Sequence, residues 1–373
     1  MIPVRRSLLK GGVAMGASLA ALIASPTLVH AQSAATERRF TPRPGAWRTF
    51  DITTRVELAD PVGTTRLWLP VPSIDSDWQR SLGSHFTSNG SARMASDGVE
   101  GARMVHAEFA SGVSPVLEVT SRVQTRNRAD LDGDRRFVPE DAPSLHHYTR
   151  ATRLLPTDGI VRQTALAATR GAKSDADKAR ALYDWVVANA WREPQVRGCG
   201  EGDIRTMLET GNLGGKCADI NALFVGLCRS VGLPARDVYG IRLAPSEFGY
   251  KELSGNPASL KGAQHCRAEV YLQARGWVAM DPADVAKVMR QETPQWLKTT
   301  EHPVVTPVYR HLFGGWEGNW LGWNTAHDLQ LPGAKEGLLN FLMYPVAETA
   351  EGRVDSYAPD AFRYTITARE ITG

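Results

Sequence analysis

The chain has 373 residues, of which 42% are hydrophobic, and its 43 basic and 40 acidic residues give a formal net charge of +3. Arg5, Arg6 and Lys10 account for this excess, so the chain after residue 31 is close to neutral. A near-neutral chain lacks the basic surface typical of proteins that bind nucleic acid or anionic lipid. No later apolar run approaches the length of a membrane span, and the chain length favours two domains.

The first 31 residues have the pattern of an export signal. Arg5 and Arg6 precede an apolar stretch, and Val29-His30-Ala31 matches an A-x-A-like cleavage site. The paired arginines favour a twin-arginine signal, with an ordinary secretory signal as the alternative. An uncleaved anchor is disfavoured because the stretch is short and interrupted by glycine and proline. We therefore expect an exported protein, periplasmic or secreted.

Alternating hydrophobic and polar residues predict a β-rich N-terminal domain over residues 40–126. One strand is expected over residues 50–58, and the turn Asp60-Pro61-Val62-Gly63 follows it. Two further stretches, 105–109 and 117–123, are expected to form an antiparallel pair. Several short strands separated by turns indicate a β-sandwich or a small barrel.

A second domain is expected over residues 145–373, after a charged, proline-containing linker at 126–147. Its first strong helix signal follows Ser174, which forms a capping box with Asp177. Alternation over residues 362–369 predicts a final strand.

The middle of this domain combines a helix, a long loop and a hairpin. A helix is expected from Cys217 to about Val231, because Gly232 follows it as a stop signal. The loop 244–263 is of a length that is uncommon in a compact domain unless the loop covers a site. Two strands are then expected at 265–272 and 277–281, joined by a short turn.

The chain has four cysteines, too few for a disulfide scaffold in an exported protein of this size. Cys228 falls on the apolar stripe of the helix that begins at Cys217 and is expected to be buried. A disulfide between Cys199 and Cys266 is left open by the sequence. A zinc site built from these cysteines and His265 is disfavoured, because the two short-spaced ligand pairs of structural zinc sites are missing.

Cys217 is the strongest candidate for catalysis, because it ends a glycine-rich turn and begins a helix. A helix N-terminus presents free N–H groups and positive potential, which lower the pKa of a thiol and hold a developing oxyanion. His265 and Asp281 lie on opposite arms of the expected hairpin, within reach of a hydrogen bond if they share one face. The carboxylate would orient the imidazole, and the imidazole would take the thiol proton.

Three segments together resemble the transglutaminase-like superfamily. The stretch Gly215-Lys216-Cys217-Ala218-Asp219 with the helix after it is similar to the nucleophile helix of that family. Residues 265–271 are similar to its histidine strand, and residues 276–282 to its aspartate strand. Trp323-Asn324-Thr325-Ala326-His327-Asp328 is a weaker match to a typical tail.

The resemblance implies an α+β fold, in which a papain/transglutaminase-like core domain is preceded by an antiparallel β-sandwich-like domain. It implies that Cys217 is the nucleophile, His265 the base and acid, and Asp281 the orienting carboxylate. One departure is Arg267, which stands where the family often has a tryptophan. This leaves open how well the acyl pocket excludes water.

Other motifs in the sequence give weaker evidence of function than these three segments. Residues 211–216 fail the spacing of a phosphate-binding loop, and no dinucleotide fingerprint is present. Trp323 and Asn324, in a tryptophan-rich stretch, are candidates for lining a substrate groove, but aromatic clusters also pack in cores.

We therefore expect a thiol enzyme without cofactor or metal that acts on amides of peptides, proteins or cell-wall peptide. Water would resolve the thioester in a peptidase or amidase, and an amine would resolve it in an acyltransferase; deamidation is a third outcome of the same chemistry. The alternative from another class is a catalytically silent peptide- or glycan-binding module on the same fold.

Overall fold

The computed structural model describes residues 38–133, 137–358 and 362–372. The expected export signal, residues 1–31, lies outside this range. Within it, no helix is both long enough and apolar enough to cross a bilayer. Residues 36–373 group as one compact unit by contacts, and the expected domain limits stay a prediction.

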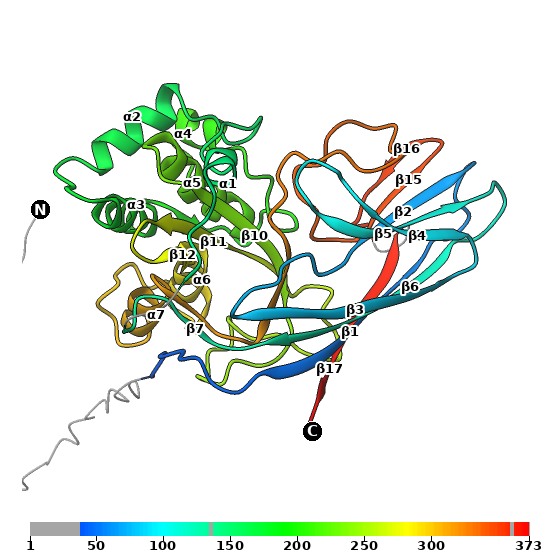
Figure 1. Cartoon of the computed structure of the whole chain (residues 1–373), viewed down its shortest axis with the longest axis horizontal. Coiled ribbons are helices and arrows are strands. Elements are labelled where there is room, and N and C mark those ends of the chain that lie inside the picture. Colours follow the sequence, from blue (N-terminus) through cyan, green and yellow to red (C-terminus); the bar gives the residue numbers. More distant parts are fainter. Residues whose placement is uncertain (1–37, 134–136, 359–361, 373) are drawn as a thin grey trace, which may run out of the picture. The chain divides into compact units, whose positions relative to one another are not determined.

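Figure 1 shows the order of the elements along the chain. The strands are β1 (Arg48–Glu57), β2 (Thr65–Pro70), β3 (Gln79–Ser88), β4 (Ser91–Ser96), β5 (Arg103–Phe109), β6 (Val116–Thr125), β7 (Arg128–Ala129), β8 (Trp191–Arg192), β9 (Gly214–Gly215), β10 (Ala235–Arg242), β11 (Gln264–Leu272), β12 (Gly276–Met280), β13 (Gly315–Trp316), β14 (Trp320–Asn324), β15 (Val346–Thr349), β16 (Gly352–Val354) and β17 (Arg363–Ile371). The helices are α1 (Ala142–His147), α2 (Gly159–Ala168), α3 (Asp175–Asn189), α4 (Ile204–Thr210), α5 (Cys217–Ser230), α6 (Pro282–Gln291) and α7 (Thr306–His311).

Two antiparallel sheets form a β-sandwich, as the sequence predicted. One has the strand order β17-β1-β6-β3 and the other β16-β15-β2-β5-β4. The alternating apolar residues of both sheets meet in one core, which includes Phe50 and Ile52 from β1 and Leu67 and Leu69 from β2. Each strand places its apolar side chains in this core because successive side chains point to opposite faces of a sheet.

The expected pairing of residues 105–109 with 117–123 is wrong. Both strands exist, but β5 pairs with β2 and β4, whereas β6 pairs with β1 and β3. The chain therefore crosses between the two sheets at residues 110–115. A short connection between two alternating strands is compatible with a hairpin and with this crossover, so the pattern alone did not distinguish them.

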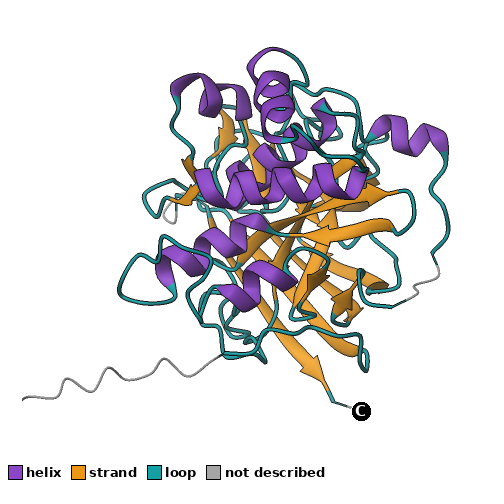
Figure 2. Ribbon diagram, turned by 90° about the vertical axis from the view of Figure 1, so that its left-hand side faces the viewer, coloured by secondary structure: helices purple, strands orange, loops and turns teal. Residues whose placement is uncertain are grey.

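A third antiparallel sheet, with the order β12-β11-β10-β14, forms the centre of the α+β core. Helix α5 packs on β10 and β11, and α2, α3, α4 and α6 contact α5 in turn. All residues of α5 are buried, as expected for a helix enclosed between a sheet and other helices. Figure 2 shows the helices lying across the strands.

The stretch expected to be a linker is partly built into the core. Strand β7 pairs with β13, and the buried Arg128 on β7 forms ion pairs with Asp130 and Glu269. At the other end of the chain, β17 pairs with β1 and β15 pairs with β2, so the C-terminal strands complete both sheets of the sandwich.

Candidate active site

The start of α5 is a tight turn built around one carboxylate. Asp219 accepts hydrogen bonds from three backbone N–H groups, including that of Lys216, each at 2.9 Å. A Cβ on Gly215 would lie 2.5 Å from the Cβ of Asp219, closer than side chains tolerate. The glycine-rich turn is therefore needed for packing, and it fixes the point at which Cys217 begins the helix.

Cys217 is 4% exposed, and the side chains of Cys199, Cys266 and His265 act on its thiol. Hydrogen bonds from the two other thiols and then from the imidazole hold the pKa of Cys217 well below its usual value, although burial opposes them. The N-terminal end of α5 adds positive potential. The structure thus favours a thiolate at position 217.

The pKa values of Cys199 and Cys266 are raised, whereas that of Cys217 is lowered. The hydrogen bond to Cys217, together with burial, raises the pKa of Cys199, and burial raises that of Cys266. All four cysteines are free thiols, so Cys199 and Cys266 are not joined by a disulfide in this structure. They act as protonated neighbours of the thiolate.

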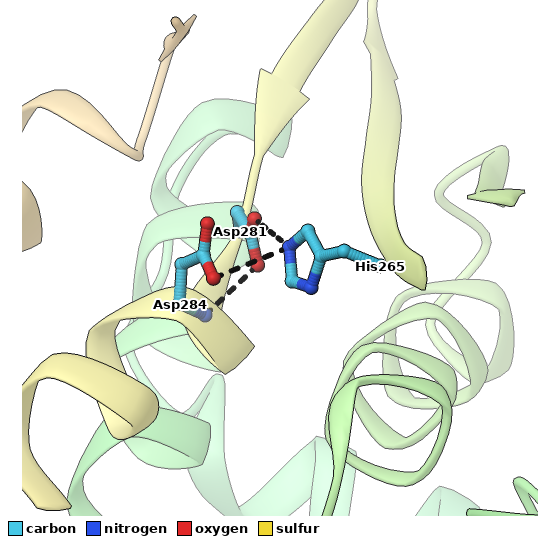
Figure 3. Close-up of side chains that lie close together, drawn as sticks. All are labelled: His265, Asp281 and Asp284. Atoms are coloured by element: carbon cyan, nitrogen blue, oxygen red, sulfur yellow. Dashed lines mark hydrogen bonds and ion pairs between the residues drawn. The ribbon is translucent and has the colours of Figure 1, made fainter. Parts of the chain in front are cut away.

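His265 faces two carboxylates, as Figure 3 shows. Its Nε2 atom lies 2.7 Å from Oδ2 of Asp281 and 3.3 Å from Oδ1 of Asp284. The expected hydrogen bond between His265 and Asp281 is therefore present, and the two residues sit on a diagonal of the hairpin that pairs Ala268 with Met280. Burial alone would lower the pKa of His265, but the carboxylates of Asp284 and Asp281 outweigh it and raise this pKa to about 9.

Two buried guanidinium groups balance these carboxylates. Arg242 donates to Oδ1 of Asp284 at 2.5 Å, and Nε of Arg267 lies 3.6 Å from Oδ2 of Asp281. Among the described residues, His265, Asp281 and Asp284 are the set whose ligand atoms converge closely enough to hold a metal ion. Because both carboxylates already face a guanidinium, the cluster suits proton handling better than cation binding.

Asn221 on α5 forms hydrogen bonds to β11, to Asp281 and to α6. It lies four residues after Cys217 on α5, and its Nδ2 donates to the carbonyl of Cys266 at 2.8 Å and to Oδ1 of Asp281 at 3.3 Å. Its Oδ1 accepts from the backbone N–H of Ala283 on α6 at 3.4 Å. Sequence reasoning missed Asn221; the spacing of four residues, which places it on the same helix face as Cys217, was the available signal.

A cavity of about 280 Å³ gives access to the cluster, and its lining includes Cys217 and His265. Gln264 also lines it, and the Nε2 atom of this buried residue has no hydrogen-bond partner within the part of the chain described. The N–H of Cys217 is in the first turn of α5, where the helix itself supplies no acceptor. Ser254 and Lys261 of the loop 244–263 complete one wall, so this loop forms part of the cavity.

The structure brings Cys217, His265 and Asp281 together and leaves Trp323 and Asn324 outside this cavity. Both lie on β14 with 2% of their surface exposed, and neither is part of the cavity lining. Nδ2 of Asn324 donates to the carbonyl of Leu342 at 2.8 Å. A larger cavity of about 640 Å³ elsewhere contains none of these five residues.

Arg267, the departure from the family pattern, lies on the Asp281 side of the cluster. Its guanidinium lies 4.6 Å from the ring centre of Trp320 and donates to the carbonyl of Glu317 at 3.0 Å. It does not line the cavity that holds Cys217. Its packing therefore affects the carboxylate rather than the space in which an acyl group would sit.

A family model described as the transglutaminase-like superfamily matches residues 162–282, a range that contains Cys217, His265 and Asp281. The chain belongs to the transglutaminase-like superfamily. The three segments of the sequence resemblance lie within this matched range, whereas the weaker tail at residues 323–328 lies outside it.

Two similar proteins extend this comparison. An uncharacterized protein of Haemophilus influenzae is 33% identical over 343 residues, which cover 86% of this chain and 91% of that protein. A crystal structure of a candidate cysteine protease from Cytophaga hutchinsonii is 15% identical, with a TM-score of 0.52, and the match covers 89% of this chain and 94% of that chain. At this identity the likeness concerns the fold alone, and it supports the transglutaminase-like fold of the present chain.

Proposed function

We propose that this superfamily member is an exported thiol enzyme that forms a thioester between Cys217 and the acyl group of a peptide or protein amide, cell-wall peptide included. The observation that carries the proposal is the buried thiol of Cys217 at a helix N-terminus, in one cavity with His265, whose imidazole is held by Asp281. In this proposal Cys217 is the nucleophile, His265 the proton carrier and Asp281 the orienting carboxylate. Export rests on the pattern of residues 1–31.

The first half of the reaction begins with the thiolate–imidazolium pair. The sulfur of Cys217 attacks the carbonyl carbon of the amide, and the carbonyl oxygen becomes an oxyanion. The N–H of Cys217 and the free amide of Gln264 are the donors that we assign to this oxyanion. The imidazolium of His265 then gives its proton to the amide nitrogen, the C–N bond breaks, and an amine leaves behind a thioester.

The second half restores the enzyme. Neutral His265 takes a proton from water or from an amine, whose oxygen or nitrogen attacks the thioester carbon. The C–S bond breaks, and the thiolate and imidazolium are restored. Water as acceptor gives a hydrolase, and an amine gives an acyltransferase; both outcomes belong to the proposal, since they use the same groups.

The alternative is a catalytically silent peptide- or glycan-binding module. Such a module needs neither an ionised sulfur nor a protonated imidazole. The enzyme is favoured because Cys217 and His265, two groups with complementary proton affinities, share one cavity.

The test is capture of the thioester. The mature protein is incubated with a peptide mixture, and its intact mass is followed while released amines are quantified. We expect an adduct on Cys217 that hydroxylamine removes, no adduct with Cys217→Ala, and turnover reduced by about 10²–10⁴-fold with His265→Ala.

Cys228→Ala is the matched control, because Cys228 is a buried thiol on the same helix that does not line the cavity. It should retain the adduct and the turnover. Peptide binding that persists without any adduct in the unmodified protein would favour the silent module instead.

A further inference from the structure

The cavity that holds Cys217 is lined by an unusual set of charges. Five basic residues line it, and no aspartate or glutamate is part of the described lining. The basic residues are Arg192, Lys216, Arg242, Lys261 and Lys287. This local excess contrasts with the near-neutral composition of the chain after residue 31.

Two of these five charges are balanced by carboxylates behind the cavity wall. Arg242 is paired with Asp284, and Nζ of Lys287 lies 3.4 Å from Oε2 of Glu252. The remaining charges of the catalytic cluster balance one another, since a Cys217 thiolate faces an imidazolium and Asp281 faces Arg267. These pairs leave no excess charge of either sign.

The other three basic residues have no such partner. Arg192 donates to the neutral Oε1 of Gln291 at 3.1 Å, and Nζ of Lys261 lies 4.5 Å from the ring centre of Tyr364. Within the described residues, neither of them nor Lys216 forms an ion pair with a carboxylate. Arg192 and Lys216 line the same cavity, and burial, and then the charge of Arg192, lowers the pKa of Lys216.

Asp219, whose charge acts on Lys216, does not lie at the cavity surface. Asp219 is buried behind the glycine-rich turn, where its two oxygens accept the three backbone hydrogen bonds described above. It is not part of the cavity lining. The three cations come from β8, the residue before Cys217 and the covering loop, so they surround the thiol from separate segments.

We infer that the amide substrate carries a carboxylate next to the bond that is cleaved, and that Arg192, Lys216 and Lys261 bind this carboxylate. The inference rests on the proposed thioester chemistry and adds its substrate class. A confined site with one sign of charge attracts the opposite sign strongly, because field lines are focused by the low-dielectric walls. A cavity of about 280 Å³ accommodates one short acidic group beside the scissile amide.

The direct test compares two alkylating probes of similar size, anionic iodoacetate and neutral iodoacetamide. Their rate constants at Cys217 are measured by peptide mass at pH 6.5 and low salt, with N-acetylcysteine amide as the reference thiol. We expect the iodoacetate-to-iodoacetamide ratio at Cys217 to exceed that of the reference by about tenfold or more. Sodium chloride at 0.5 M should reduce the excess, because exposed charges are screened.

Variants that remove one basic charge each show which residues raise the iodoacetate-to-iodoacetamide ratio. Lys261→Gln and Arg192→Gln should each lower the ratio several-fold, whereas Lys173→Gln, at an exposed position outside the cavity, should leave it unchanged. A wild-type ratio equal to that of the reference thiol, insensitive to salt and to these variants, would overturn the inference. The ratio is read on one sulfur, so it is independent of the absolute reactivity on which the proposed function depends. Slow reaction with both probes would count against the nucleophile, not against the anion site.

Two pairs of peptide substrates distinguish the source of the carboxylate. One pair carries glutamate or glutamine beside the scissile amide, and the other ends in a free carboxylate or an amide. A higher kcat/KM for the acid in the first pair assigns a side-chain carboxylate, and in the second pair a terminal one. Equal kcat/KM within both pairs contradicts the inference.

Discussion

The imidazole of His265 is controlled by more charged groups than a three-residue site requires. Asp281 accepts its hydrogen bond at 2.7 Å, and Asp284 lies close behind at 3.3 Å. Each carboxylate in turn faces one guanidinium, that of Arg267 or Arg242. The protonation state of His265 therefore depends on a balanced cluster of buried charges rather than on a single carboxylate.

The two carboxylates should be separable by mutation. Asp281→Asn keeps an oxygen that accepts from Nε2 of His265. It removes one of the charges that raise the pKa of this imidazole to about 9. Since a protonated His265 is needed to release the amine, turnover falls as pH rises through the pKa of His265. We expect this falling limb of the kcat–pH profile to move to lower pH in Asp281→Asn.

Asp284→Asn supplies the comparison. It should move the same limb to lower pH, and it should also cost about 3–5 kcal/mol in the free energy of unfolding, because Arg242 is left buried without its partner. Replacing Arg242 by Met in the same chain should recover part of that loss, measured by denaturant unfolding. A limb that stays in place in both single variants would show that neither carboxylate sets the pKa of His265.

At the scale of elements, one amide connects α5 to β11 and to α6. Asn221 bonds to Cys266 next to His265, to Asp281 and to the N-terminus of α6. It is not part of the cavity lining, so we regard it as a positioning residue. Its loss should disturb the alignment of sulfur and imidazole.

Asn221→Ala should lower kcat more than it changes KM, and it should cost about 1–3 kcal/mol in unfolding free energy, because buried backbone groups lose their partner. Asn319→Ala is the matched control: Asn319 is equally buried and donates to two carbonyls, those of Ala244 and Leu253, neither of which belongs to Cys217, His265 or Asp281. The control should lose similar stability with much less loss of kcat. Equal losses of kcat in both variants would show that Asn221 contributes only to stability and does not position the catalytic groups.

Elements with strong local signals were predicted well. The capping box of Ser174 and Asp177 begins α3, and α5 begins at Cys217 and ends one residue before the expected Val231. Polar edge strands were missed: most side chains of β3 and β4 are exposed, so their sequences lack the apolar alternation by which a strand is recognised. The pairing of β5 and β6 was wrong because local pattern does not assign a strand to a sheet.

At the scale of the whole described chain, the arrangement depends on contacts between residues far apart in sequence. The expected final strand is confirmed as β17, but its pairing with β1 brings residues 363–371 against residues 49–57, which no local pattern predicts. The same reason explains the site. Cys217, His265 and Asp281 were recognisable from motifs, whereas Arg242, Gln264 and Asp284 acquire a role only when three elements converge.

The central claim is that Cys217 is a thiolate beside a protonated His265 at neutral pH. It is tested most directly by the rate of alkylation of Cys217 with iodoacetamide between pH 4 and pH 10, in the wild type and in His265→Ala. We expect a wild-type rate that is already high at mildly acidic pH, and in the variant a rise displaced toward the ordinary thiol pKa of about 8.5. A single rise near that ordinary value in both proteins would contradict the account.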